Sequence, residues 1–569
     1  MKYTRYIYAI LTGAILTISS CKEEFLEEKP YSNYSTTAIS ASTIEAQLVG
    51  LHRNYAELWG WSGQQGFTSA WQIGMDITSA GATQGVENGF YQYATLNSEN
   101  GAVAHLWTRC YDFINNANII IAATGDNSKA ANAEARFFRA YAYNTLVTLW
   151  GDVPMLTEPI TVPTFNLTRQ KVADIDALID ADLTYAVANL PDAGKAVTES
   201  RINIDIARQL AAEAYLRIGM RDNSYFAKSE KMSTDIINNT RYKLIEARYG
   251  KFLGEGGDYY RDMFRFGNQR YSQGNTEAIW TFEVEYNRNV PNGTIDNPQQ
   301  RRVWQPSYHN WSEMVNADSL GGRGNGRLRL SNFMKYTVWK GLEGDIRNSN
   351  YNIRRTTNYN RPGINKVIGI TADGFRAGTN DVAATTTTIK TGDKVIPFRN
   401  DSLVTWYPYP TKWGGYDPTD DFGYALVKDW SVMRLGETYL LRAEARFRQN
   451  NTSGAADDIN KLRDRAFKQA RTTQSNPLLG RVSAADINID FILDERAREL
   501  IAEENRRITL VRTGKLKDRI AKNGDPGPAD KITTGFQDFN ALLPIPLNEI
   551  LLNNKGGVSS LVQNPGYTK

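Results

Sequence analysis

The sequence is poor in the residues that build metal centres and disulfide scaffolds. Its 569 residues include two cysteines, Cys21 and Cys110, and three histidines, His52, His105 and His309. Two cysteines cannot form a disulfide framework or a cysteine zinc site, and the histidines lie far apart along the chain. We therefore expect neither a metal site nor a bound cofactor.

The sequence also lacks a surplus of charge and the common enzyme motifs. It has 66 Lys and Arg against 62 Asp and Glu, a net charge of +4. Nucleic-acid binding normally needs a concentrated basic face, so we expect no nucleic-acid partner. No G-x-S-x-G, H-E-x-x-H, Walker or dinucleotide-binding motif occurs, which removes support for the chemistries that these motifs carry. A hydrophobic content of 41% is still enough for a large core.

The first residues have the pattern of an export signal. Lys2 and Arg5 precede an apolar run over residues 7–18, which is too short to span a bilayer. Ser19 and Ser20 then precede Cys21, as at the cleavage site of a bacterial lipoprotein, although Ile18 replaces the usual Leu. We therefore predict a signal peptide at 1–20 and lipidation of Cys21. An ordinary secretory signal followed by a chance cysteine is the alternative.

The residues from Cys21 onward indicate which side of the membrane the protein faces. Cys-Lys-Glu-Glu at 21–24 resembles the surface-export tetrad of outer-membrane lipoproteins. Several acyl chains on one cysteine anchor a protein durably, since each buried CH2 contributes ~0.8 kcal/mol. We expect a lipid-anchored protein of the outer membrane that is exposed on the cell surface.

Helical periodicity dominates the rest of the chain. Apolar residues recur at helical spacing in four stretches, which predicts helices with one buried face. These stretches are 103–121, 133–150, 204–219 and 433–466. In the last of them, residues 450–454 turn the chain between two stripes rich in small residues, which is the pattern of a tetratricopeptide-type hairpin. A further helix is predicted from about Phe491 to Asn505, and Cys110 is expected to be a core side chain.

Between these stretches the pattern and composition of the sequence change. Residues 278–286 alternate apolar and polar side chains, which predicts a half-buried strand. Residues 290–311 and 371–423 are rich in Pro, Asn, Gly and Thr, and loops of this length are usually functional or mobile. We expect a mostly α-helical scaffold that carries large loop and short-strand excursions.

Eight segments together resemble the SusD/RagB family of surface glycan-binding lipoproteins. Among them, RFFRAYAYNTLVTLWGDVPMLTEP at 136–159 is close to a family hallmark. The segments follow the family's order, and they are 25–30, 101–118, 133–159, 277–286, 344–360, 433–466, 494–516 and 543–567. One departure occurs at 504–510, where Glu-Asn-Arg-Arg-Ile-Thr-Leu stands in place of the family's G-H-R-x-x-D-L and puts the hydrogen bonding of that turn in doubt.

The resemblance implies a SusD-like fold and a non-enzymatic role. Tetratricopeptide-like hairpins would form a scaffold that docks on a SusC-like TonB-dependent transporter of the outer membrane. The protein would capture oligosaccharide or polysaccharide and pass it to the pore. We expect an N-terminal region at 21–225, a variable loop-rich region at 226–430 and a C-terminal helical region at 431–569, with 21–569 as one compact unit.

A glycan-binding surface needs flat aromatic rings together with polar side chains. Trp107, Trp150 and Trp280 lie on apolar stripes and are expected in the core, and Trp339 and Trp430 are expected in the scaffold. The resemblance places the glycan surface in an N-terminal loop and in the variable region. The candidate ligand-binding residues there are Trp59, Trp61, Trp71, Arg302, Trp304, Tyr308, Asn310 and Trp311. The alternative is that loop tryptophans only pin long loops to the body.

Three other functions stay open. A surface glycoside hydrolase could use Glu283 and Glu285, which on one face of a strand would lie ~6.6 Å apart, within the range of inverting enzymes. Charges opposite the apolar face of a strand are, however, an ordinary solvated pattern. The cargo could also be a peptide or another nutrient, and a scaffold that holds only a protein partner is the third possibility.

Overall fold

The computed structural model describes residues 41–61, 65–125, 128–284, 299–315, 323–398, 406–414, 428–523, 533–554 and 557–567. The predicted signal peptide at 1–20 and Cys21 lie outside these ranges. Residues 47–569 form one compact unit and residues 1–46 are counted apart from it. The predicted division into N-terminal, variable and C-terminal regions stays a prediction. Within the described ranges, no helix combines the length and the apolar character needed to cross a membrane.

Helices make up most of the regular structure, so the prediction of a mostly α-helical protein is confirmed. The α-helices are α2 Ala41–Ala56, α3 Gln65–Ala70, α4 Gly101–Thr124, α5 Lys129–Trp150, α6 Val172–Asn189, α7 Ile204–Gly219, α8 Ser224–Ile237, α9 Tyr259–Asp262, α10 Gln300–Trp304, α11 Asn332–Lys335, α12 Leu435–Arg448, α13 Thr452–Ala466, α14 Lys468–Thr473, α15 Ile489–Leu500, α16 Arg506–Arg512, α17 Leu516–Asn523 and α18 Leu547–Leu552.

The strands are short and pair only in twos within the described residues. The antiparallel pairs are β1 Thr78–Ala80 with β3 Leu328–Leu330, β2 Ala278–Phe282 with β8 Trp430–Arg434, β4 Ile353–Arg354 with β7 Tyr409–Pro410, and β5 Asn365–Ile370 with β6 Thr385–Lys390. Short helical turns that position later residues are η2 Glu57–Trp61, η6 Tyr271–Gln273 and η8 Tyr308–Asn310.

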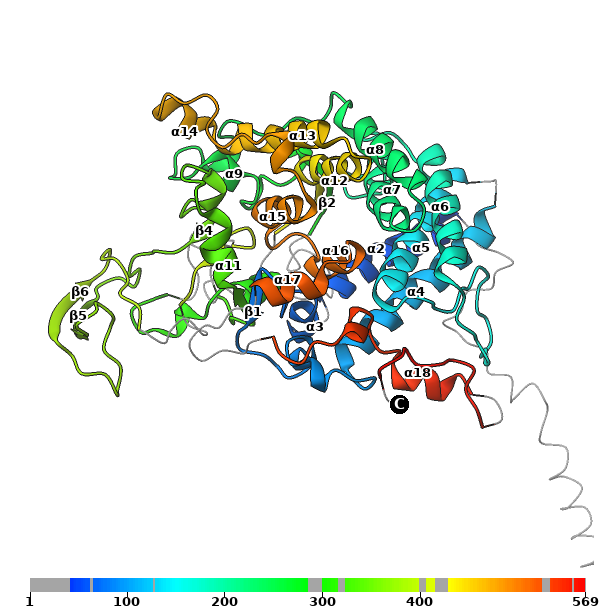
Figure 1. Cartoon of the computed structure of the whole chain (residues 1–569), viewed down its shortest axis with the longest axis horizontal. Helices are drawn as coiled ribbons and strands as arrows, with labels where there is room; N and C mark the ends of the chain where they lie inside the picture. The colour runs from blue at the N-terminus through cyan, green and yellow to red at the C-terminus, as the bar shows by residue number, and fades with distance from the viewer. Residues whose placement is uncertain are drawn as a thin grey trace, which may run out of the picture. The chain divides into compact units, whose positions relative to one another are not determined.

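Antiparallel helical hairpins form the scaffold, as predicted. Helix α5 packs against α4 and α6, α7 packs against α8, and α12 packs against α8 and α13. Figure 1 shows α4 to α8 side by side in cyan and green, with α12 and α13 in yellow next to α8. Ala212 of α7 and Ala445 of α12 lie in one buried cluster with Phe226 of α8, so small side chains allow these helices to approach closely.

Local sequence signals set the ends of the first helices. Asn100 caps α4 by accepting hydrogen bonds from the backbone N–H groups of Ala102 and Val103. Helix α5 ends at Gly151, whose φ of 73° is a conformation that glycine adopts at little cost. The predicted stripe on α4 is buried at Val103 and Trp107, and Cys110 lies with them, where burial raises the pKa of its thiol.

The helix predicted from about Phe491 to Asn505 ends earlier, at Leu500, because the chain turns there through Ala502 with φ 64°. The turn leaves backbone carbonyl groups free for buried side chains. The Glu499 oxygen accepts hydrogen bonds from Lys412 and Arg434, and the Ala502 oxygen accepts one from Trp413.

The departure at 504–510 is accommodated by different side chains. The Asn505 side chain accepts a hydrogen bond from the Ile508 N–H and so caps α16. Arg506 pairs with the buried Asp76 at 2.6 Å, and Thr509 donates to Glu504. Other side chains therefore cap and brace this turn without the Gly and His of the family pattern.

The strand predicted at 278–286 is present as β2 but is buried on both faces rather than half-buried. Its partner β8 and the segment just before η6 cover the polar side. Thr281 donates from its hydroxyl to the Gln269 oxygen, so a polar side chain is satisfied without water. Residues 285 and 286 lie outside the described ranges.

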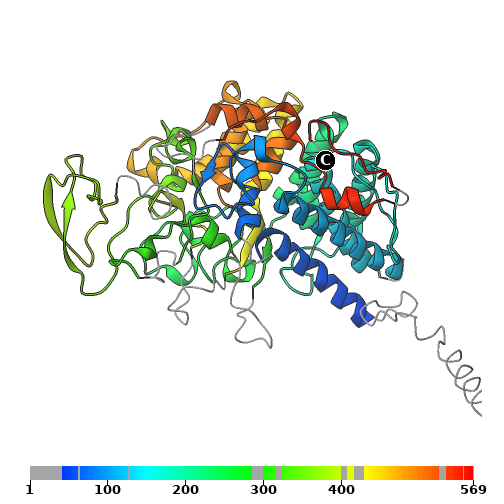
Figure 2. The ribbon, with the colours of Figure 1, turned by 90° about the horizontal axis from the view of Figure 1, so that it is seen from below.

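The variable region contributes a separate aromatic core. Tyr308, Trp311 and Trp406 form a buried cluster with Ile368 of β5 and Ile389 of β6. Figures 1 and 2 show the β5–β6 hairpin well away from the helical hairpins. The hairpin therefore acts as a cover for the aromatic residues of this region.

A buried ion network joins the C-terminal helices to the strands. Glu499 of α15 pairs with Arg347 at 2.9 Å, with Arg434 at 2.6 Å and with Arg465, and Arg465 also pairs with Glu277 at 2.6 Å. Burial alone would raise the pKa of Glu499, but Arg465, Arg434 and Arg347 hold it well below its usual range. The carboxylate is therefore charged in the interior.

Candidate functional site

A cavity of about 150 Å³ lies where the helical hairpins meet β8 and the turn after α15. Its walls come from segments far apart in the sequence. They are the end of α2 with η2, α3, α5, α7, α10, residue 413, β8, the start of α12, and the stretch from α15 to α16. The polar and aromatic side chains of these elements converge on one space.

Aromatic rings form much of the wall. Seven rings line the cavity, and they are Tyr55, Trp59, Trp71, Tyr141, Trp304, Trp413 and Trp430. The centroids of Trp413 and Trp430 are 5.8 Å apart, and Tyr55 lies 5.7 Å from Trp430. The Trp59 indole donates a hydrogen bond to the Tyr141 hydroxyl. Trp59 is half-buried, whereas Trp71 and Trp304 are 1% and 3% exposed.

Charged groups also line the cavity. Glu437 of α12 pairs with Arg496 at 2.9 Å and accepts a hydrogen bond from Gln209. Burial raises the pKa of Glu437, Arg496 opposes the rise, and the neighbouring Glu213 adds to it. The Glu213 carboxylate makes no hydrogen bond or ion pair with any residue that the structure describes. One carboxylate is therefore free to meet a polar ligand.

Several polar atoms of the wall residues also lack partners. Within the described residues, no hydrogen bond reaches the Trp71 Nε1, Gln72 Oε1, Gln300 Oε1, Arg496 Nη1 or Asn505 Nδ2 atoms. Buried polar atoms normally have a protein or water partner, and leaving one unpaired costs about 1–3 kcal/mol. These donors and acceptors beside aromatic rings suit a ligand that carries both hydroxyl groups and apolar faces.

The structure brings together three of the predicted binding residues. Trp59, Trp71 and Trp304 line the cavity, although they come from η2, the residue after α3, and α10. Trp61 is the last residue of η2, and its side chain lies outside the described part of the structure. The role of these residues in ligand binding stays a prediction.

The other predicted residues lie elsewhere. Tyr308 and Trp311 belong to the aromatic core under the β5–β6 hairpin, with exposed fractions of 1% and 8%. The open ring faces expected of a stacking platform are therefore not found at these two positions. Arg302 is buried and Asn310 is exposed. Whether these four side chains contact a ligand stays a prediction.

Sequence reasoning did not select the remaining wall residues. Trp430 was expected in the scaffold, and from its place in β8 it also lines the cavity. Glu213 and Glu437 lie on α7 and α12, whose apolar stripes indicated only packing. The one local signal for a site was Glu213 itself, a charged residue between Ala212 and Ala214. Its position in the sequence does not indicate which residues of other elements line the same cavity.

The contacts of Glu283 do not support glycoside hydrolysis, and the described residues offer no metal-binding cluster. Glu283 pairs with Arg270 at 2.7 Å and accepts a hydrogen bond from the Ser200 N–H, so this carboxylate holds a loop in place. Glu285 lies outside the described ranges, and the Glu283–Glu285 pair stays a prediction. Within the described residues, no group of three or more His, Cys, Asp or Glu side chains could hold a metal ion.

Two family models match the chain. The model described as the SusD family matches residues 276–567, and the model described as starch-binding associating with outer membrane matches residues 24–218. The chain is 26% identical to the "SusD-like protein P25" of Formosa agariphila over 570 residues, which covers 95% of each chain.

Solved structures share the fold. A "Laminarin binding SusD-like protein" matches with a TM-score of 0.62 and 20% identity, over 93% of this chain and 100% of that one. Surface glycan-binding protein A from Bacteroides thetaiotaomicron, in complex with laminarihexaose, matches with a TM-score of 0.62 and 17% identity, over 92% and 99%. At these identities the match shows a common fold.

Proposed function

Because the chain belongs to the SusD family, we propose that it binds oligosaccharide or polysaccharide at the cell surface and delivers it to a SusC-like TonB-dependent transporter without cleaving it. The observation that carries the proposal is the cavity whose lining combines aromatic rings with a free carboxylate and unpartnered amide groups. Sugars offer apolar C–H faces and a rim of hydroxyl groups, and this lining matches both.

We propose that Trp59 and Trp304 contact the sugar ring and that Glu213 accepts hydrogen bonds from its hydroxyl groups. Trp59 is the least buried of the tryptophans in the wall, so its ring is the most accessible to an entering ligand. Trp71 would form the floor. Two of the similar structures are named for laminarin or laminarihexaose, which makes β-glucan a reasonable first ligand class to test.

We also propose that lipidation of Cys21 anchors the protein in the outer membrane. The match to a family described as associating with the outer membrane supports this location. The helical hairpins α4 to α8 and α12 to α13 are the scaffold that we propose docks on the transporter. Co-purification of the full chain from outer membranes tests this partnership, and recovery without any transporter would contradict it.

Glycan binding is tested with the soluble chain from Lys22 onward and a panel that includes laminarihexaose and maltohexaose. Isothermal titration should show binding to at least one oligosaccharide with no release of reducing ends. Release of reducing ends would favour a hydrolase, and binding of a peptide alone would favour the other cargo.

The role of the cavity is tested with Trp59→Ala and Trp304→Phe. Removing the Trp59 ring, or replacing the Trp304 indole by a smaller phenyl ring, should weaken binding about tenfold, which corresponds to 1.4 kcal/mol. Trp339→Phe is the matched control, because Trp339 is buried like Trp304 but donates its indole N–H to the Met334 oxygen outside the cavity. Unchanged affinity in both cavity variants would refute this site.

A further inference from the structure

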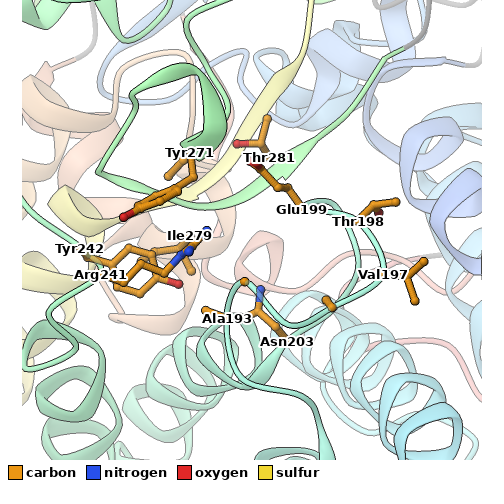
Figure 3. Close-up of a pocket in the computed structure, with 13 residues that line it drawn as sticks. Ala193, Val197, Thr198, Glu199, Asn203, Arg241, Tyr242, Tyr271, Ile279 and Thr281 are labelled. Carbon is orange, nitrogen blue, oxygen red and sulfur yellow. The ribbon is translucent and has the colours of Figure 1, made fainter.

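A second cavity, of about 170 Å³, lies apart from the tryptophan-lined one. The connection between α6 and α7, over residues 193–203, forms one side of it, and β2 together with Arg241, Tyr242 and Tyr271 forms the other (Figure 3). This volume is below the roughly 300–1,000 Å³ of pockets for drug-sized ligands. It therefore suits one small unit, such as a single monosaccharide.

Arg241 presents a guanidinium group that is fixed but not neutralised. The Cζ atom of Arg241 lies 3.5 Å from the centroid of the Tyr271 ring. The backbone N–H of Arg241 donates a hydrogen bond to the Asn239 side chain. Figure 3 shows the side chain extended beside Tyr271 and Ile279 at the cavity. Among the described residues, the guanidinium has no carboxylate partner within ion-pair distance.

Stacking on an aromatic ring leaves the edge N–H donors of an arginine available. A carboxylate is the group that matches two of these donors at once. Gly194 keeps this side of the cavity open, since a Cβ at that position would come within 2.7 Å of Arg241 Nη1.

Tyr242 adds a second donor beside Arg241. Its side chain is 4% exposed, and its hydroxyl lies near Arg241 and Asp205 without hydrogen-bonding geometry to any described residue. Burial and the Asp205 carboxylate raise the pKa of Tyr242, so the hydroxyl keeps its proton. Asp205 itself is engaged by Arg208 and Asn239.

The opposite wall carries acceptors. Glu199 accepts a hydrogen bond from the Ser272 N–H at 3.1 Å, which holds its carboxylate at the cavity but leaves acceptor positions on both oxygens. Thr198 adds a hydroxyl, which forms a hydrogen bond of 3.0 Å with the Ser200 hydroxyl. Figure 3 shows Thr198 and Glu199 on the connection that faces Arg241 and Tyr271 across the cavity.

These groups define what the cavity can hold. One side offers a guanidinium and a phenol, both donors, and the other offers a carboxylate and a hydroxyl, which accept. We propose that this cavity binds an acidic monosaccharide unit, with the sugar carboxylate on Arg241 and Tyr242 and the sugar hydroxyls on Glu199 and Thr198. The proposal rests on the proposed glycan binding and extends it to uronic-acid units.

The test uses the soluble chain from Lys22 onward and isothermal titration with D-glucuronate, D-glucose and acetate. Glucuronate should bind more tightly than either of the other two, because only glucuronate carries both the carboxylate and the hydroxyl groups. Arg241→Gln should weaken glucuronate binding at least tenfold, and Tyr242→Phe should weaken it severalfold.

Lys195→Gln is the matched control. It removes one positive charge from the same connection, where Lys195 is exposed and paired with Asp192. Its glucuronate affinity should equal that of the parent chain at moderate salt. Equal losses in Lys195→Gln and Arg241→Gln would mean that only net charge matters, and this would overturn the proposal.

Further outcomes separate this inference from the proposed function. Trp304→Phe should keep its affinity for glucuronate, while Arg241→Gln should keep its affinity for a neutral oligosaccharide. Neutral binding with no glucuronate binding would overturn the second site alone. Acetate binding as tight as glucuronate binding would overturn the assignment to a sugar.

Discussion

Removing the Glu499 carboxylate from the interior should destabilise the protein strongly. Glu499 is the common partner of Arg347, Arg434 and Arg465, and it and these three arginines are all buried. In Glu499→Gln the volume is nearly unchanged, but three buried guanidinium groups lose a shared negative charge. Removing one partner from a buried pair costs about 3–5 kcal/mol because the remaining charge is left uncompensated.

This cost translates into a measurable shift in melting temperature. The entropy of unfolding is about 2.1 cal/mol/K per residue, so residues 47–569 give about 1.1 kcal/mol/K and the expected loss is about 3–5 °C. Glu246→Gln is the control, because Glu246 pairs with Lys468 with both side chains about half exposed. An exposed pair contributes about 0–1 kcal/mol, so this control should lower the melting temperature by at most about 1 °C.

The pH dependence gives an independent check. The pKa of Glu499 is lowered on folding, so its contribution is fully present above the unfolded value of about 4.3 and is lost as the pH falls further. The difference between the parent and Glu499→Gln, measured by differential scanning calorimetry, should therefore shrink below about pH 4. A difference under 1 °C at pH 7 would refute the reasoning.

Three further predictions concern other parts of the chain. Cys21→Ala should release the protein from the membrane fraction, measured by fractionation and immunoblotting, and full retention would contradict lipid anchoring. Gly151→Ala should cost about 1–3 kcal/mol in thermal unfolding because of its φ of 73°, whereas Gly50→Ala, inside a helix with open space around it, should be neutral or stabilising. Burial lowers the pKa of Lys412 to about 8, against the pull of Glu503, so the unfolded chain binds more protons between about pH 8 and 10. Stability should rise with pH over that window, and Lys412→Met should flatten the rise; an unchanged slope would exclude Lys412 as its source.

The helical scaffold could be predicted because its signals are local. The spacing of apolar residues predicted a helix at 204–219, which are the bounds of α7, and one that ends at residue 150, where α5 ends. The end of α15 at Leu500 could not be predicted in this way. It depends on Lys412, Arg434 and Trp413, which use the freed carbonyl groups and lie far away in the sequence.

The candidate site was only partly predictable for the same reason. Aromatic residues in Gly- and Ser-rich surroundings pointed to Trp59, Trp71 and Trp304, which do lie together. The same reasoning selected Tyr308 and Trp311, whose cover by the β5–β6 hairpin depends on packing between segments far apart in sequence. Composition indicates that a ring lies in a loop, but it does not indicate what packs on that ring.

The ion network extends through one more ion pair to the wall of the tryptophan-lined cavity, which links stability to ligand binding. Glu503 lies in the cavity wall and pairs with Arg434 at 2.6 Å, and Arg434 pairs in turn with Glu499. Arg496, also in the wall, is held by Glu437 and by Glu504 at 2.7 Å. Side chains held in this way lose little freedom when a ligand binds, so the buried charges also lower the entropic cost of binding.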